Sequence, residues 1–312
     1  MKVSMKVLTI TLGFAGALCA TSALAAPNWS SVPAKDVKLF YPGQSSWEWV
    51  LTPSDHPGAV KFRGGKNCFA CHNGDEPNMG KLLVSGQKNE PTPIAGKPGS
   101  IDAKVQMTHD ATNMYVRLVF APGNQPNAGQ DKEYSTKVTM MIDGGGVPEV
   151  ARGGCFAMCH QDSADMPAAH GADRTMYLYK TRQKLTATGG GDALVSPDAL
   201  AKLKASGYSI EYWQARLNEG KPAVVENGEI FAKREETKPT EVSADAAYKG
   251  GTWTVTLTRK LNAGGGFITL QPGKTYTVAF AIHAGHTNKR FHYVSFERSM
   301  TLDGGNADFV VK

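Results

Sequence analysis

Several features that mark common protein classes are missing from this sequence. It has no dense run of Lys or Arg, and a formal net charge of +6 over 312 residues gives little support for a nucleic-acid partner. No G-x-S-x-G elbow, Walker A motif or Rossmann fingerprint occurs. The triplets Gly144–Gly146 and Gly189–Gly191 are therefore interpreted as flexible turns rather than phosphate cradles. The composition, 41% hydrophobic and 20% charged, excludes wholesale disorder.

Long hydrophobic runs are also absent, apart from a short one at the N-terminus. Lys2 and Lys6 precede the apolar stretch 7–19, which is too short to span a bilayer, and Ala23-Leu24-Ala25 is a small-x-small cleavage signal. Residues 1–25 are therefore predicted to be a secretory signal peptide. Cys19 raises the alternative of a lipoprotein, but Leu18 stands where a small residue is expected. The mature chain, with a charge of +4 and no membrane segment, is expected in an oxidising compartment, a bacterial periplasm.

Cysteine is scarce, and four of the five residues lie in two clusters. The first, Cys68-Phe69-Ala70-Cys71-His72, matches the C-x-x-C-H pattern of c-type haem attachment. Two thiols two residues apart reach the two vinyl groups of one haem, and the following His72 falls under the iron. A disulfide or a zinc site is the alternative for this cluster.

The second cluster is Cys155-Phe156-Ala157-Met158-Cys159-His160, with one extra residue between the cysteines. The loop must bulge to bring both thiols to the vinyls, so the spacing is a weaker signal by itself. Both clusters nevertheless begin Cys-Phe-Ala, and no other cysteine remains in the mature chain. We therefore predict two covalently attached haem c groups. The alternative is a Cys155–Cys159 disulfide with His160 as a surface residue.

Two haems need up to four axial ligands, of which His72 and His160 are the predicted proximal pair. The remaining histidines are His56, His109, His170, His283, His286 and His292. Position along the chain favours four of them as distal ligands: His109, His170, His283 and His292. Thioether ligation is the alternative, with candidates Met166, Met158 and Met79, and it would raise the reduction potential. The pair His283 and His286 also has a zinc-like spacing, but no further ligand lies close by in sequence.

The chain divides into two regions of different texture. Residues 26–100 lack a regular pattern and are predicted to form a loop-rich haem-binding lobe. From residue 101 onward, strand-like runs alternate with Gly, Pro, Asn and Asp, which predicts a mainly β fold, an antiparallel β-sandwich with few short helices. The expected strands are Ile101–Thr108, Asn113–Phe120, Thr136–Ile142, Thr175–Thr181, Thr252–Arg259, Thr275–Ala281 and Tyr293–Phe296. One helix is expected at Pro197–Ala205, and the second cysteine cluster lies in an insertion over 143–174.

The β-rich region, 101–312, resembles a known family. Its segments 108–118, 154–167, 174–179, 213–216, 280–283 and 290–295 are similar to the haem-binding domain of the ethylbenzene dehydrogenase gamma subunit. Relatives of that subunit occur in dimethyl-sulfide dehydrogenase, selenate reductase and chlorate reductase, and a subgroup consists of periplasmic multihaem c-type cytochromes. The gamma subunits hold a b-type haem between Met and Lys. The resemblance places His292 where the family has its lysine, and Met166 loosely where it has its methionine.

These observations favour a periplasmic dihaem cytochrome that relays single electrons rather than an enzyme. Its expected partners are a quinol-oxidising membrane cytochrome and a terminal periplasmic oxidoreductase. Lys61, Lys66 and Lys81, near the first cluster, are candidates for steering an acidic partner, or they only solubilise the chain. Two alternatives stay open: a haem enzyme acting on a small nitrogen or sulfur species, and a haem subunit of a molybdenum oxidoreductase complex.

Overall fold

The computed structural model describes residues 27–312, so the predicted signal peptide and Cys19 lie outside the described residues. The fold is mainly β, as predicted. The long strands are β1 (Lys35–Phe40), β2 (Ser100–His109), β3 (Asn113–Phe120), β4 (Thr136–Asp143), β7 (Ile210–Leu217), β8 (Val224–Ile230), β10 (Val242–Lys249), β11 (Thr252–Lys260) and β12 (Thr275–Ala284). The short strands are β5 (Leu185–Thr186), β6 (Gly189–Gly190), β9 (Arg234–Glu236), β13 (Tyr293–Val294), β14 (Arg298–Leu302) and β15 (Phe309–Val311).

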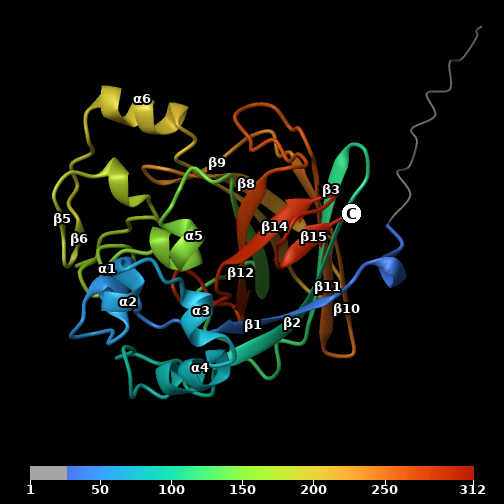
Figure 1. Cartoon of the computed structure of the whole chain (residues 1–312). Helices are drawn as coiled ribbons and strands as arrows, with labels where there is room; N and C mark the ends of the chain where they lie inside the picture. The colour runs from blue at the N-terminus through green and yellow to red at the C-terminus, as the bar shows by residue number, and fades with distance from the viewer. Residues whose placement is uncertain (1–26) are drawn as a thin grey trace, which may run out of the picture.

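All but two of these strands form one sheet that folds over on itself. Its order is β10-β11-β3-β2-β1-β13-β12-β4-β7-β8-β9, with β14 and β15 branching from β12. The neighbours pair antiparallel, except for the parallel pair β14–β15. The two halves of the sheet face each other, because β10 and β11 contact β7 and β8 although they stand far apart in the strand order. The predicted β-sandwich is therefore present (Figure 1).

Alternation of side chains explains why these segments form strands. On β3, the side chains of Met114, Val116, Leu118 and Phe120 are all buried, and on β11 every second residue from Trp253 is buried. Period-two burial is the pattern of a strand with one face on a core. The expected strand at 113–120 coincides with β3, and the helix expected at Pro197–Ala205 is α6, capped by Ser196.

One expected strand is wrong. Residues 175–181 form no ladder and end in the 3-10 turn η3 (Tyr179–Thr181). Tyr177 and Leu178 are fully buried, which explains the apolar pattern, but their amides bond to the separate carbonyls of Met158 and Phe231 at 3.4 and 2.7 Å. The strand-like apolar pattern of this segment therefore reflects the burial of a connecting segment and not its pairing with a neighbouring strand.

The helices gather to one side of the sandwich (Figure 1). They are α1 (Trp47–Leu51), α2 (Ala59–Arg63), α3 (Cys68–His72), α4 (Glu76–Val84), α5 (Val150–Gly153) and α6 (Pro197–Ala205), with 3-10 turns η1 (Trp29–Ser31) and η2 (Gly154–Met158). The segment expected to be loop-rich thus holds four short helices, and its β1 joins the sheet between β2 and β13. Across residues 27–312, no helix has both the length and the apolar character needed to cross a bilayer.

Candidate haem sites

The first cysteine cluster occupies a single turn of helix, α3. Asn67 caps it, because its side-chain oxygen accepts a hydrogen bond from Ala70 N at 2.8 Å. In one helical turn, positions separated by three or four residues share a face, so Cys68, Cys71 and His72 lie on the same side of α3. Cys68 is buried and Cys71 is exposed, and neither forms a disulfide. The turn therefore presents two free thiols and an imidazole together, the donor set that C-x-x-C-H chemistry requires.

A second imidazole lies beside this turn. His56, in the loop between α1 and α2, has its ring centroid 6.0 Å from that of His72, with the ring planes tilted by 41°. Burial lowers the pKa of His72, which keeps its ring in the neutral form that a metal binds. Sequence analysis assigns His56 no particular role, because a histidine in a Pro/Gly-containing loop carries no local signal of what it faces.

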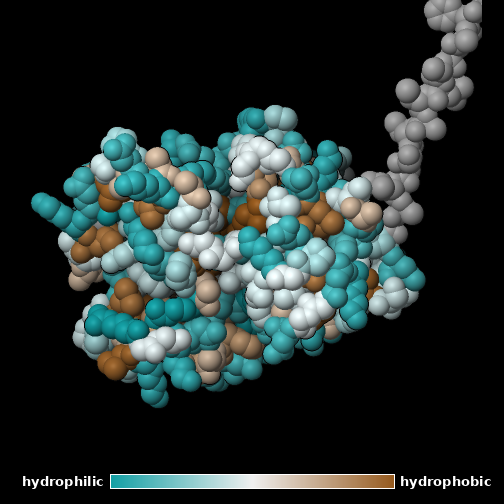
Figure 2. All heavy atoms as spheres, turned by 45° about the horizontal axis from the view of Figure 1, so that its top comes forward, coloured by the Kyte–Doolittle hydropathy of each residue, from teal (hydrophilic) through white to brown (hydrophobic). Residues whose placement is uncertain are grey.

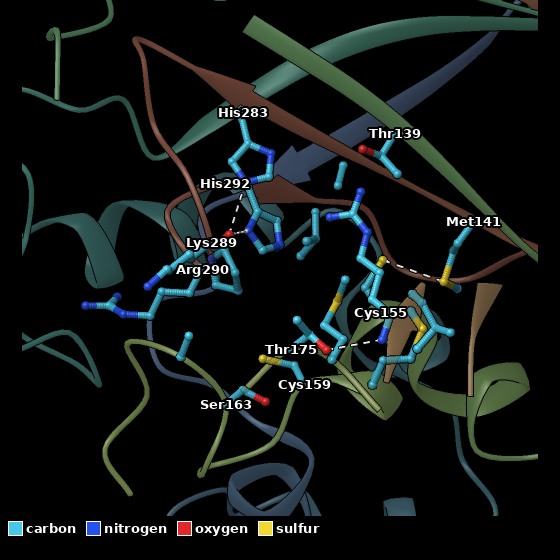
Figure 3. A pocket seen from close by; sticks show the side chains of 18 of the residues that line it. Thr139, Met141, Cys155, Cys159, Ser163, Thr175, His283, Lys289, Arg290 and His292 are labelled. Atoms are coloured by element: carbon cyan, nitrogen blue, oxygen red, sulfur yellow. Dashed lines mark hydrogen bonds between the residues drawn. The ribbon is translucent and has the colours of Figure 1, made fainter. Parts of the chain in front are cut away.

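The second cysteine cluster borders an internal cavity of about 230 Å³. Cys155 comes from η2 and Cys159 follows it directly, and both are free thiols whose pKa burial raises to about 12. Three of the predicted ligands line the same cavity: Met166, His283 and His292. Figure 3 shows the two histidines on the β12 side, across the cavity from Cys159 and Ser163. The fold therefore brings together residues that are up to 137 positions apart in the chain.

Both of these histidines offer a lone pair. His283 Nε2 and His292 Nδ1 each donate a hydrogen bond to the Lys289 carbonyl, at 3.0 and 2.7 Å. A carbonyl only accepts, so the other nitrogen of each ring is unprotonated. His283 Nδ1 is buried and has no hydrogen-bond partner among the described residues. Burial lowers the pKa of His283 and lowers that of His292 to about 4, so both rings are neutral. Two thiols and neutral imidazoles around one cavity fit a covalently attached haem.

His160 lies outside this cavity. Its side chain is fully buried and stacks on Tyr177 with ring centroids 3.9 Å apart. Its Nδ1 is 2.6 Å from Glu48 Oε1 and its Nε2 is 3.1 Å from the Tyr177 carbonyl. Glu48 also accepts from Gln161 N, so α1 is joined directly to the second cluster. A carboxylate behind a histidine is a common support for a metal ligand, but here the Nε2 is engaged by the carbonyl.

Two other predicted ligands stand apart from both clusters. His109, at the end of β2, has Nδ1 2.9 Å from the Asp110 carbonyl and Nε2 3.0 Å from Asp303 Oδ1. His170 is exposed, in a loop with a positive φ of 47°. The structure thus brings His283, His292 and Met166 to a site and leaves His109 and His170 away from it.

One short segment separates the two sites, the residues Phe296 and Glu297 between β13 and β14. Phe296 stacks on His72 at 5.9 Å and lies 6.5 Å from Phe156, a residue that lines the second cavity. The Glu297 carboxylate accepts from Phe69 N at 2.9 Å, and a Cβ added to Gly154 would lie 3.1 Å from Glu297 N. Burial raises the pKa of Glu297 to about 7. Phe296 therefore packs near an aromatic or imidazole ring of each cysteine cluster, and Glu297 bonds to the first cluster while its backbone passes close to Gly154, just before the second.

Comparisons with known proteins identify the family of the chain. The sequence profile described as "Ethylbenzene dehydrogenase" matches residues 26–295. A relative named cytochrome c-552, from Stutzerimonas stutzeri, is 36% identical over 298 residues, covering 94% of this chain and 92% of that protein. A relative named cytochrome c-551, from Rhodocyclus tenuis, is 27% identical over 282 residues, covering 89% and 96%.

Among solved structures, a family 9 carbohydrate-binding module from Caldicellulosiruptor kristjanssonii in complex with cellotriose superposes with a TM-score of 0.31. The identity is 8%, over 63% of this chain and 65% of that chain, which is too little similarity to bear on function. The family match and the two cytochromes confirm the resemblance found in the sequence. The chain belongs to the ethylbenzene dehydrogenase family.

Proposed function

We propose that this protein is a periplasmic dihaem c-type cytochrome that transfers single electrons between partner proteins. The observation that carries the proposal is the arrangement of two cysteine pairs, each with imidazoles nearby, around the shared residues Phe296 and Glu297. The two relatives match this chain over most of their length, and their names, cytochrome c-552 and cytochrome c-551, support the same class of protein. When bound, each haem supplies a one-electron couple.

The residues of the chain have separate parts in this function. Cys68 and Cys71 attach the first haem, and Cys155 and Cys159 the second. His72 ligates the first iron. His292 is the first choice for the second, because its Nε2 is free and the cavity lies in front of it. His160 stays the proximal candidate from the motif, and ligation by it requires the Tyr177 carbonyl to be released.

The proximity of the two sites supports electron exchange inside the molecule. Phe40, Phe156 and Phe296 form one aromatic cluster, with centroids 5.0 to 6.5 Å apart, and the cluster reaches from His72 to the second cavity. A packed aromatic layer excludes water. An electron that crosses it therefore does not require surrounding water molecules to reorient. An electron that enters at one haem is therefore delivered to the other through the protein interior.

The surface around the first site suits an acidic redox partner. Val60 and Leu82 are exposed, at 69% and 48%, and stand on α2 and α4 next to the exposed lysines Lys61 and Lys81. Apolar groups ringed by positive charge favour a short-lived complex that charge steers and salt weakens. The donor proposed is a quinol-oxidising membrane cytochrome and the acceptor a terminal periplasmic oxidoreductase.

The haem count tests the proposal. The full-length gene is expressed with haem-maturation machinery, and the mature protein is measured by intact mass and by pyridine haemochrome. The wild type is expected to carry two haems, the C68A/C71A variant one, and the C155A/C159A variant one. Each double variant serves as the control for the other. A wild type with a single haem that the C155A/C159A change leaves in place would contradict the two-centre function.

The same samples separate electron transfer from catalysis. Two six-coordinate, low-spin haems leave no open position for a substrate, whereas a high-spin haem that binds cyanide would favour the enzyme. Co-purification with a molybdenum-containing protein would favour the role of a subunit in a larger complex.

A further inference from the structure

The first haem site has a histidine that the attachment motif does not include. His56 and His72 face each other with ring centroids 6.0 Å apart. Nitrogen ligands stand about 2 Å from a metal, so two imidazoles on opposite sides of one ion have centroids about 6 Å apart. Rings that pack directly also reach this separation, as Phe40 and Phe156 do at 6.1 Å, so the distance alone does not assign a ligand. The separation of His56 and His72 is the one that a metal atom between the two rings requires, and the contacts of their nitrogens carry the argument further.

The contacts of the two rings indicate which nitrogens face this space. His56 Nδ1 lies 3.0 Å from the Val50 carbonyl, so it donates its proton there and leaves Nε2 with a free lone pair. His72 Nδ1 lies 3.9 Å from Asp75 Oδ2, an ion-pair contact that is longer than a hydrogen bond. Metal-bound histidines typically direct the second nitrogen to a carbonyl or a carboxylate in this way. Each ring therefore has its distal nitrogen available for a ligand bond.

The surroundings hold both rings in place. Trp49, on α1, lies 5.5 Å from the His56 ring, and Phe296 stacks on His72 at 5.9 Å with only 22° between the planes. Gly58 packs against the Cε1–Nε2 edge of the His56 ring, because a Cβ there would lie 3.0 Å from Cε1 and 3.1 Å from Nε2. Ser46 caps α1 by accepting from Trp49 N at 3.1 Å, which fixes the start of the segment that carries His56.

We propose that His56 is the second axial ligand of the haem attached to Cys68 and Cys71, opposite His72. This inference rests on the proposed function, since it requires a haem at the first site. It makes the first haem a six-coordinate bis-histidine centre with no open position. That centre is an electron carrier, and any small-molecule chemistry is confined to the second cavity.

The test is a pair of His56 variants in the full-length, haem-loaded protein. His56→Ala is expected to convert one of the two haems from low spin to high spin, which halves the low-spin signal in the optical and electron paramagnetic resonance spectra. Added imidazole is expected to restore that signal by occupying the vacated space. His56→Met, which keeps the bulk of the side chain, is expected to raise the potential of one haem, because a thioether favours the reduced iron.

The matched control is His170→Ala, which removes an exposed histidine that does not line the second cavity. It is expected to leave both spectra and both potentials unchanged. Two attached haems with an unaltered low-spin signal in His56→Ala would overturn the inference while the proposed function stands. A pyridine haemochrome count of zero in the C155A/C159A variant would instead overturn the proposed function.

Discussion

At the scale of single residues, two neighbouring imidazoles are the candidates for the iron ligand at the proposed second haem site. His283 and His292 share the Lys289 carbonyl as acceptor, and their ring centroids are 4.9 Å apart. That separation is too short for a metal between the rings, so they cannot both bind one iron from opposite sides. The His292 Nε2 is the free nitrogen in the segment that resembles the family's ligand position.

Replacing His292 with Ala is therefore expected to turn one haem high-spin and to raise its potential, because a strong nitrogen ligand of the oxidised iron is lost. Optical spectra and redox titration of the dihaem protein measure both effects. His283→Ala is the matched control and is expected to keep both haems low-spin. If His292→Ala keeps the low-spin spectrum and His283→Ala loses it, His283 and not His292 is the ligand.

The residues that sequence could identify are the local ones. The cysteines and His72 stand in a continuous motif, and His292 was found through a short segment resembling the family. His56 was not found because its contact with His72 arises from the packing of three short helices, which no pattern along the chain encodes. The same holds for Glu297, which meets both clusters only after β14 is in place.

At the scale of elements, strands were predictable where one face is buried and the other is not. β3 and β11 alternate cleanly, and their bounds follow from the alternation. The four N-terminal helices have five to nine residues each, too few turns for a helical period to show. β1 lies inside the sheet, and its last residues, Leu39 and Phe40, are both buried, so it has no alternation to detect there.

A buried carboxyl group at the end of β4 is expected to make the free energy of unfolding depend on pH. Asp143 is fully buried, and burial raises its pKa to about 6, although its Oδ1 accepts from Gly146 N and Val147 N at 3.1 and 3.2 Å. The folded chain therefore holds a proton there that the unfolded chain, with a pKa near 4, has released. Stability contributed by this proton is present below about pH 4 and is lost as the pH rises through about 6.

The loss amounts to about 3 kcal/mol, from roughly two pKa units at 1.4 kcal/mol each. Asp143→Asn keeps the Oδ1 acceptor and cannot ionise. Urea unfolding between pH 4 and 7 is expected to show a flatter pH dependence in this variant than in the wild type. If the free energy of unfolding depends on pH in the same way in both proteins, the pKa of Asp143 is not raised in the folded chain.

At the scale of the whole molecule, one buried ion pair joins the two halves of the sheet. Arg259 on β11 and Glu211 on β7 are 1% and 4% exposed, with Nε and Oε1 3.0 Å apart. Trp213 Nε1 donates to the same Glu211 oxygen at 2.6 Å. Figure 2 shows one face of the molecule, which is largely hydrophilic with hydrophobic side chains in small separate groups.

Arg259→Met is expected to lower the free energy of unfolding by about 3 to 5 kcal/mol, because it leaves the Glu211 carboxylate buried without its cation. Thermal and urea unfolding measure the loss, and the double variant with Glu211→Leu is expected to recover much of it. The exposed pair Lys38–Asp102 is the control, since Lys38→Met is expected to cost at most about 1 kcal/mol. A loss of similar size in both single variants would show that the buried pair does not join the halves.

The position of Phe296 and Glu297 has a consequence for the order in which haem attachment and folding of the C-terminal strands occur. Both cysteine clusters lie in the first 160 residues, and the segment that closes them comes from the last twenty. Once that segment has docked, Cys68 is only 7% exposed, and a thiol so covered cannot receive a macrocycle. In the dihaem cytochrome proposed above, the thioether bonds therefore form on a chain whose C-terminal strands have not yet docked. Haem attachment is then confined to the interval before those strands close over the cysteines.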